Sequence, residues 1–131
     1  MRPSAIIITT VIVIIGIIMF NFLSKSGGNG DMSEWKQKVE SEPGVIIDVR
    51  TQSEYDQGHL EKVDEHYDFN SGEFEEKVDD MDKEKTYYLY CRTGNRSGQA
   101  AEIMKEKGFE NVHNIGGYQD LVNAGFKPSW D

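Results

Sequence analysis

The chain's only cysteine lies in a strand–turn–helix pattern, and this pattern limits the possible folds more than any other feature. Residues 86–90 are aromatic, aliphatic or β-branched, which is typical of a strand. Cys91 follows at once and begins a short turn that contains Gly94. A helical pattern then runs over residues 97–107, and Gly108 is placed to end it. The sequence therefore predicts a thiol held between the end of a strand and the start of a helix.

Strand and helix patterns alternate along the rest of residues 31–131. Residues 45–49 form a continuous apolar run, which is typical of a strand buried on both faces. We expect further strands at 66–69 and 112–115, the second being the last in the chain. The other helices are expected at 32–39, 53–57, 72–81 and 118–123. This alternation predicts an α/β fold with a parallel sheet and helices on both faces, in which ligands bind beyond the carboxyl ends of the strands.

The predicted surroundings of Cys91 favour a negatively charged sulfur. Backbone N–H groups at the start of a helix have no intrahelical partner. Those amides, the positive end of the helix dipole, Arg92 and Arg96 all favour an anion. We therefore expect a thiolate, with its pKa lowered from about 8.5 toward the range of roughly 3.5–7.5. An inert buried cysteine is the alternative, and the position at a strand end, Gly94 and the two arginines argue against it.

Residues 5–23 are nearly all apolar and predict one transmembrane helix ahead of the domain. A helix of this length reaches about 28 Å, close to the roughly 30 Å of a hydrocarbon core. A cleaved signal peptide is the alternative, although its apolar region is usually shorter, about 7–15 residues. A buried core helix is disfavoured, because no other segment would cover so uniform an apolar surface. We therefore expect an anchor or signal segment at 1–23, a flexible linker at 24–30 and a domain at 31–131.

The charges beside this segment favour one orientation in the membrane. Arg2 and the amino terminus precede it, and Lys25 follows it. Positive charge tends to stay on the cytoplasmic side. We expect a membrane protein with a single-pass anchor and its domain on the extracytoplasmic side; a secreted domain is the alternative if the segment is cleaved.

The charge and cysteine content exclude several classes of function. The formal net charge is −9, and the first acidic residue is Asp31, so the negative charge belongs to the domain. Without a basic patch to meet phosphates, nucleic acid is not an expected partner. A lone cysteine excludes an internal disulfide and a cysteine-cluster metal site.

Three stretches resemble motifs of the rhodanese family of sulfurtransferases, and they occur in the family's order. They are Asp48-Val49-Arg50 leading through Glu54-Tyr55 to Gly58-His59-Leu60, the cysteine loop itself, and Asn114-Ile115-Gly116-Gly117 followed by Ala124-Gly125. The resemblance covers residues 32–128. The chain differs from the family in two places. Leu121 stands where tryptophan is usual, and residues 61–66 are polar where a small apolar stretch is usual.

The resemblance implies a single-domain rhodanese, a thiosulfate sulfurtransferase that works without a cofactor or metal and as a monomer. Cys91 would attack the outer sulfur of thiosulfate, release sulfite and keep a persulfide, which cyanide or a small thiol then takes. Six residues of the loop would bind the anionic donor through their amides and the two guanidinium groups: Arg92, Thr93, Gly94, Asn95, Arg96 and Ser97.

Two other functions remain open at this stage. The spacing from Cys91 to Arg96 is Cys-x4-Arg, whereas protein tyrosine phosphatases and their relatives with a rhodanese fold use Cys-x5-Arg to surround a phosphate. The shorter loop suits a smaller sulfur group, so a phosphatase or arsenate reductase is the weaker reading. A persulfide carrier or binding module without turnover is the other.

Asp48, Arg50 and His59 are expected to support the site. Asp48 can accept loop amide bonds at the end of its strand, and Arg50 can pair with Glu54. His59 is read as a packing and hydrogen-bonding residue, because an ionised thiol needs no general base. Residues 116–117, both glycine, are expected to form a turn with φ > 0 near the active site.

Overall fold

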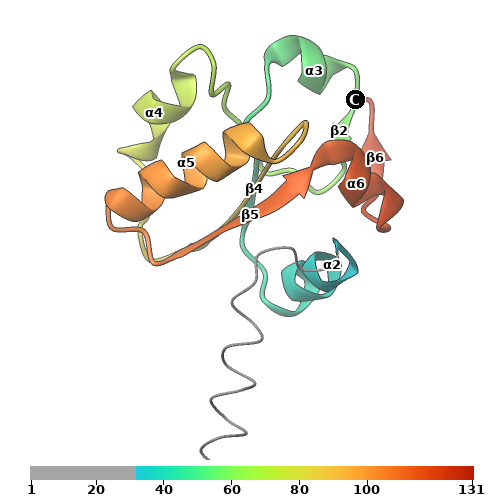
Figure 1. The fold of residues 1–131 in the computed structure, drawn as a ribbon, viewed down its shortest axis with the longest axis horizontal. Coiled ribbons are helices and arrows are strands. Elements are labelled where there is room, and N and C mark those ends of the chain that lie inside the picture. Colours follow the sequence, from blue (N-terminus) through green and yellow to red (C-terminus); the bar gives the residue numbers. More distant parts are fainter. Residues whose placement is uncertain (1–31) are drawn as a thin grey trace, which may run out of the picture. The chain divides into compact units, whose positions relative to one another are not determined.

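The computed structural model describes residues 32–131. The predicted anchor at 5–23 and linker at 24–30 lie outside the described residues. Within residues 32–131, no helix is long and apolar enough to span a membrane. The elements in chain order are α2 (Met32–Ser41), β1 (Val45–Asp48), α3 (Gln52–Asp56), β2 (His59–Leu60), β3 (Glu65–His66), α4 (Glu73–Val78), β4 (Thr86–Cys91), α5 (Asn95–Glu106), β5 (Asn111–Gly117), α6 (Tyr118–Asn123) and β6 (Pro128–Ser129) (Figure 1).

The expected parallel sheet is present and holds four strands in the order β3-β1-β4-β5. β1 and β4 pair in parallel from Val45 opposite Tyr87 to Asp48 opposite Tyr90. β4 and β5 are also parallel, with an irregularity after Leu89 that places Cys91 opposite Gly117. The carboxyl ends of β1, β4 and β5 therefore meet at one edge of the sheet, and Cys91 lies there.

Helices cover both faces of the sheet, as the alternating pattern predicts. On one face, Phe74 and Val78 of α4 and Ala100 and Met104 of α5 pack with side chains of β1 and β4. On the other face, α2 and α6 pack against β4 and β5, and Leu121 is fully buried among these side chains. Leu121 thus fills its core position without the aromatic ring usual in the family. Figure 1 shows α5 running along β4 and β5.

Several element boundaries differ from those expected. α5 begins at Asn95, two residues before the helical pattern, because Gly94 takes a left-handed φ of 94° and starts the helix there. The helix expected at 72–81 covers only Glu73–Val78, and Gly72 precedes it with a φ of 87°.

Two strand predictions were also wrong in detail. The strand expected at 66–69 is Glu65–His66, although Tyr67 and Phe69 still donate backbone hydrogen bonds to β1 or the residue after it. β5 extends to Gly117 and is not the last strand. A short antiparallel pair, β2 with β6, closes the end of the domain, and neither strand was predicted. Two-residue strands carry too little periodicity to be recognised.

Candidate active site

Cys91 is the last residue of β4, and its sulfur lies under the turn that leads into α5. The residue is 1% exposed and forms part of the core beneath α5. The Gly94 N–H donates a hydrogen bond to Sγ at 3.0 Å. The backbone amides of Thr93 and Ser97 also favour the charged form of the sulfur, and the Ser97 hydroxyl lies 3.4 Å from it. Amides from both the turn and the helix start therefore converge on one atom, as the sequence predicts.

These hydrogen bonds affect the pKa of the thiol. Burial alone would raise the pKa of Cys91, because it disfavours the charged form. Hydrogen bonds from the Ser97 hydroxyl and from the three amides act in the opposite direction and outweigh burial, so the pKa is lowered. The residue is thus buried, and yet the charged form of its sulfur is favoured relative to a free thiol.

The end of β5 allows the loop to take this shape. A Cβ atom at Gly117 would lie 2.6 Å from the carbonyl oxygen of Arg92, so only glycine lets the two backbones approach this closely. Gly117 itself is extended, with φ −96°. Gly116 has φ +104°, as expected, but it lies in β5 and not in a turn. The predicted positive φ is thus right for Gly116 and wrong for Gly117, and the predicted turn is absent at both because they end β5.

The ion pairs around the loop differ from the predicted ones. Glu54 pairs with Arg96, and not with Arg50 as expected, through Nη1–Oε1 and Nη2–Oε2 contacts of 2.8 and 2.9 Å. Glu54 also forms a capping box with Thr51 at the start of α3. The Arg96 hydrogen bonds and those from Thr51 outweigh burial and lower the pKa of Glu54 to about 2. Arg96 is therefore already engaged in the described structure.

Arg92 lies in the loop but differs from Arg96 in its surroundings. Its side chain is exposed and makes no hydrogen bond or ion pair to any residue in the described part of the chain. The two arginines that the sequence assigns to the donor's anionic end are thus unequal. Arg92 has its guanidinium free, and Arg96 is held by Glu54.

Asp48 and Arg50 form a buried structural pair next to the site. Asp48 accepts from the Arg50 backbone N–H at 2.8 Å, which confirms that it receives a loop amide. Its two oxygens also accept from the Arg50 guanidinium at 2.7–3.0 Å. Arg50 further donates to the Gly58 carbonyl at 2.7 Å and lies over the Tyr118 ring at 4.4 Å. The pair therefore joins the end of β1 to the segment before β2 and to α6.

His59 is buried and packed, which agrees with its expected structural part. Nδ1 lies 3.0 Å from the Leu60 carbonyl, and Nε2 lies 2.8 Å from the main-chain oxygen of Asp131. Its ring stacks on Tyr55 at 4.1 Å. Both ring nitrogens already have partners, and neither partner is the Cys91 sulfur.

Asn114 is a site residue to which the sequence reasoning assigned no part. Its Nδ2 donates to the Gly94 carbonyl at 2.9 Å, and its Oδ1 accepts from the Ser97 hydroxyl at 2.7 Å and the Gly116 N–H at 3.1 Å. It thus holds the loop, the start of α5 and the end of β5 together. The signal for it was the Asn114-Ile115-Gly116-Gly117 motif, in which only the glycines had been interpreted.

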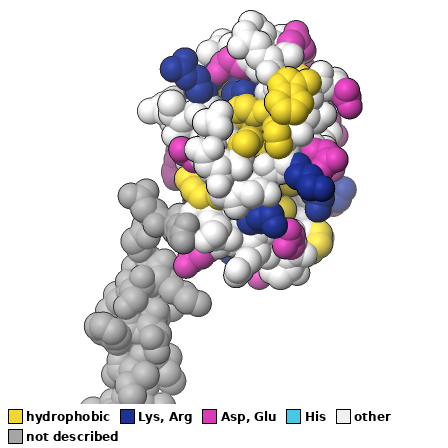
Figure 2. All heavy atoms as spheres, turned by 90° about the vertical axis from the view of Figure 1, so that its right-hand side faces the viewer, with side chains coloured by type: hydrophobic (Ala, Val, Ile, Leu, Met, Phe, Trp, Pro, Cys, Tyr) yellow, Lys and Arg dark blue, Asp and Glu magenta, His cyan; other side chains and the backbone are white. Residues whose placement is uncertain are grey.

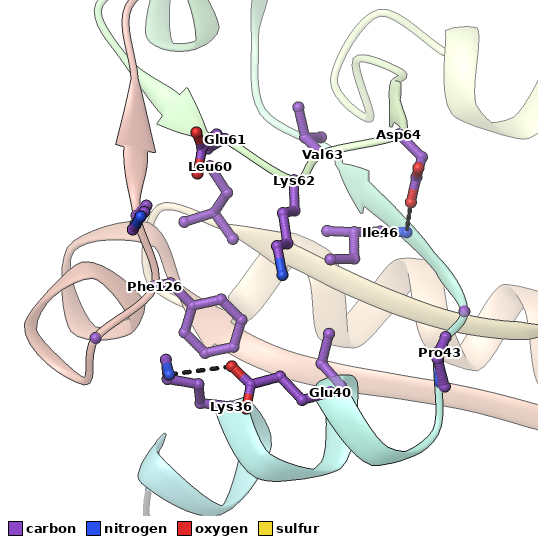
Figure 3. A pocket seen from close by; sticks show the side chains of 14 residues that line it. Lys36, Glu40, Pro43, Ile46, Leu60, Glu61, Lys62, Val63, Asp64 and Phe126 are labelled. Atoms are coloured by element: carbon purple, nitrogen blue, oxygen red, sulfur yellow. Dashed lines mark hydrogen bonds and ion pairs between the residues drawn. The ribbon is translucent and has the colours of Figure 1, made fainter.

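A hollow of about 710 Å³ lies away from the cysteine loop, near the start of β1. Figure 3 shows Phe126 and Ile46 lining it, Lys36 paired with Glu40, and Asp64 bonded to the Ile46 N–H. Three lysines and three acidic residues line it, so its charge favours neither anion nor cation: Lys36, Lys62, Lys127, Glu40, Glu61 and Asp64. None of the residues that line this hollow belongs to the cysteine loop, so we do not take the hollow as the active site.

The face that carries α6 and β6 has a mixed surface. Figure 2 shows hydrophobic side chains gathered there among acidic and basic ones. Trp130 is the large hydrophobic side chain exposed in the described part of the chain, at 71%. It lies beside Gly58, where a Cβ atom would be 3.2 Å from its Nε1.

Comparison with known families fits this geometry. The family profile described as "Rhodanese-like domain" matches residues 31–124. The chain belongs to the rhodanese-like domain family. Residues 31–124 hold the cysteine loop, both strands beside it and the Glu54–Arg96 pair.

Individual relatives carry several names. The chain is 32% identical over 111 residues to a "Putative sulfur carrier protein" of Bacillus subtilis, covering 76% of this chain and 58% of that protein. It is 36% identical over 78 residues to a "Thiosulfate sulfurtransferase" of Escherichia coli, covering 58% of this chain and 72% of that protein. A solved structure, "rhodanese with anions from E. coli", superposes with a TM-score of 0.57 at 31% identity, over 66% of this chain and 98% of that one. This rhodanese-like protein thus has sulfurtransferase homologues with differing names.

Proposed function

We propose that this protein is a sulfurtransferase that carries sulfane sulfur on Cys91, with thiosulfate or a similar anion as donor. The observation that carries the proposal is the Cys91 sulfur itself, which receives hydrogen bonds from the loop amides and has a lowered pKa. A thiolate is the nucleophilic form of cysteine. Because the chain has only one cysteine, the persulfide would form on that atom.

The proposed reaction has two steps that return the enzyme to its starting state. The Cys91 thiolate attacks the outer sulfur of thiosulfate and forms a new S–S bond. The bond between the two thiosulfate sulfurs breaks, and its electron pair leaves with sulfite. Cyanide or a thiolate then attacks the outer sulfur of the persulfide, and the S–S electron pair returns to Cys91. No external oxidant or reductant is needed.

The loop amides and Arg92 would recognise the donor. Amides aimed at the sulfur stabilise negative charge where it persists through the reaction. The free guanidinium of Arg92 is suited to an oxyanion group such as a sulfonate. Arg96 would have a smaller part, since Glu54 bonds both of its Nη atoms and leaves Nε–H and one N–H on each Nη for the donor.

Intact-protein mass spectrometry tests the proposal directly. We expect wild-type protein treated with thiosulfate to gain one sulfur atom and to lose it again when cyanide is added. Cys91→Ser should gain none and should not turn over thiosulfate and cyanide, while its circular dichroism stays unchanged. Wild-type protein alkylated at Cys91 is the control for non-specific labelling. More than trace turnover by purified Cys91→Ser would refute the assignment.

A persulfide carrier is the second candidate, because Cys91 is almost wholly covered and Arg96 is occupied. One relative is named a putative sulfur carrier. Single-turnover kinetics separate the two functions. For a sulfurtransferase, the rate at which the loaded protein passes its sulfur to cyanide should be at least as fast as its steady-state turnover. A carrier should load fully, react slowly with cyanide and release its sulfur to a protein thiol.

The phosphatase or arsenate-reductase reading is tested by substrate choice. The Cys91 to Arg96 loop has the Cys-x4-Arg length. We expect the native protein to prefer thiosulfate over an aryl phosphate. Inserting one glycine between Asn95 and Arg96 should weaken sulfur transfer and favour phosphate-like substrates. Faster hydrolysis of the aryl phosphate by the native protein would contradict the sulfur assignment.

We further propose that residues 5–23 anchor a monomeric domain to a membrane, with Cys91 on the extracytoplasmic side. The length and apolar character of the segment support this. Full-length protein should remain with membranes after a carbonate wash, and Cys91 should react with an impermeant thiol reagent in intact cells. A shortened, soluble product would instead favour a cleaved signal peptide.

A further inference from the structure

The Ser97 hydroxyl has two possible acceptors and only one proton. Its oxygen lies 2.7 Å from Asn114 Oδ1 and 3.4 Å from the Cys91 sulfur. A hydroxyl donates one hydrogen bond and accepts up to two. It can therefore donate to Asn114 or to the sulfur, but not to both at once.

Neighbouring backbone groups determine how the Asn114 amide is oriented. The Gly94 carbonyl can only accept, so the atom that bonds it at 2.9 Å must be the amide nitrogen. The Gly116 N–H can only donate, so the atom that bonds it at 3.1 Å must be the amide oxygen. The oxygen of Asn114 thus faces Ser97, and the Ser97 hydroxyl has to be the donor in that contact.

While the sulfur is protonated, the Ser97 hydroxyl donates to Asn114 Oδ1, because that contact is the shorter of the two. The hydroxyl proton then points to Asn114, and the lone pairs of Ser97 remain free to accept from the thiol S–H. When the thiol loses its proton to solvent, the sulfur can no longer donate. Rotation about the Ser97 Cβ–Oγ bond then brings the hydroxyl proton to the thiolate. Asn114 Oδ1 keeps the Gly116 N–H during this exchange.

We propose that Asn114 is a positioning residue that competes with the Cys91 sulfur for the Ser97 proton and so sets the pH at which the thiolate forms. It contacts neither the sulfur nor, in this proposal, the donor, and it acts through Ser97. The proposal rests on the proposed function only in taking the thiolate as the reacting form. It adds that the Asn114 amide, on β5, changes the pH at which the thiolate forms.

Charged groups near the loop must be separated from this effect. They come from the loop itself, α5, α3 and the end of β1: Arg92, Arg96, Glu54, Asp48 and Arg50. α4 faces the same core with apolar side chains, and β5 approaches the loop with Asn114 and two glycines. All five charged groups are present in every variant, so an influence that is the same in both backgrounds cancels in a comparison of paired variants.

A double-mutant cycle tests the proposal with the full-length protein. The rate of iodoacetamide alkylation against pH reports the titration midpoint of Cys91, which is the only thiol. Asn114→Ala removes the competing acceptor but also the bonds to Gly94 and Gly116. The same substitution in a Ser97→Ala background retains only the second effect. Asn114→Ala should lower the titration midpoint by about 0.7 pH units more when Ser97 is present than in the Ser97→Ala background. Below the midpoint, this difference corresponds to about a fivefold rise in the thiolate fraction.

Equal changes in both backgrounds would overturn the proposal and leave Asn114 as a brace for the loop. Asn123→Ala on α6, another exposed amide, is the control and should move neither midpoint. If Asn114→Ala does not fold, Asn114→Asp in both backgrounds provides the same comparison. Its carboxylate is the stronger acceptor, so the midpoint should rise more with Ser97 than with alanine at position 97. The assay needs no sulfur transfer, so absence of catalysis would refute the proposed function and not this inference.

Discussion

Arg96 and Glu54 form a two-point ion pair that joins the cysteine loop to α3. The pair spans 42 positions of sequence, with contacts of 2.8 and 2.9 Å. Arg96 lies in the first turn of α5, and Glu54 lies in the helix that follows β1. The position of the loop arginine therefore depends on a carboxylate from a different motif.

The first prediction concerns acid stability. The folded pKa of Glu54, about 2, lies below its unfolded value of about 4.3, so its contribution is complete above that value and is lost as pH falls toward 2. Between about pH 4.5 and 2, the free energy of unfolding should fall by about 1–2 kcal/mol more in wild-type protein than in Glu54→Gln, because solvent weakens this partly exposed pair. Urea unfolding at each pH measures this. Glu102→Gln, an exposed change on α5, should behave like wild type. Parallel curves for wild type and Glu54→Gln would show that the pair adds nothing.

The second prediction separates the two loop arginines. Arg92→Ala should raise the KM for thiosulfate and leave the melting temperature within about 1 °C, because the side chain is exposed and unpaired in the described structure. Arg96→Ala should lower stability by about 1–2 kcal/mol, because it strands Glu54. It should also raise the pKa of Cys91, since it removes positive charge near the sulfur. Steady-state kinetics, thermal unfolding and alkylation profiles give the three readouts. If Arg92→Ala and Arg96→Ala changed the KM, the stability and the pKa of Cys91 equally, the two arginines would not have the different parts proposed here.

The third prediction tests the structural part of Arg50. Arg50→Lys should destabilise the domain by about 2–4 kcal/mol, because a lysine cannot meet both Asp48 oxygens and the Gly58 carbonyl together. Sulfur transfer per folded molecule should change less than twofold at a temperature where the variant is folded. A loss of activity without a loss of stability would instead make Arg50 part of the chemistry.

The cysteine loop and the parallel sheet were predictable from sequence because their signals are local. A strand, a thiol, a glycine and a helix follow one another within about twenty residues, and each has a clear pattern. Buried strands such as β1 stand out as continuous apolar runs. The sequence also distinguished His59 as a packed residue, since an ionised thiol removes the need for a base.

Partner choice across the fold was less predictable. Glu54 has an arginine four positions before it and another 42 positions after it, and local spacing favours the nearer one. The structure pairs it with the distant one, because the buried Asp48 already occupies Arg50. Asn114 was missed for a similar reason: its three partners lie on β5, in the loop and at the start of α5. A repeating pattern along the sequence does not show which residues from separate elements come into contact.

The last prediction concerns the close approach of β5 to the loop. Gly117→Ala would place a Cβ atom 2.6 Å from the Arg92 oxygen and 3.2 Å from the Thr93 Cα. Both are backbone atoms, so the loop itself must move, and the amides that bond the sulfur should lose their alignment. We expect the pKa of Cys91 to rise and sulfur transfer to fall by about tenfold to a hundredfold. Alkylation against pH and initial rates measure the two effects.

Gly72→Ala is the matched comparison for this change, because it separates backbone strain from crowding. Gly72 has φ +87°, so alanine there is strained, but no atom lies within 4 Å of the added Cβ. Gly117 has φ −96°, which any residue adopts, and only space is at issue. Gly72→Ala should therefore cost about 1 kcal/mol of stability and leave the Cys91 titration unchanged. Normal reactivity of Cys91 in Gly117→Ala would mean that the loop keeps its amides on the sulfur without support from β5.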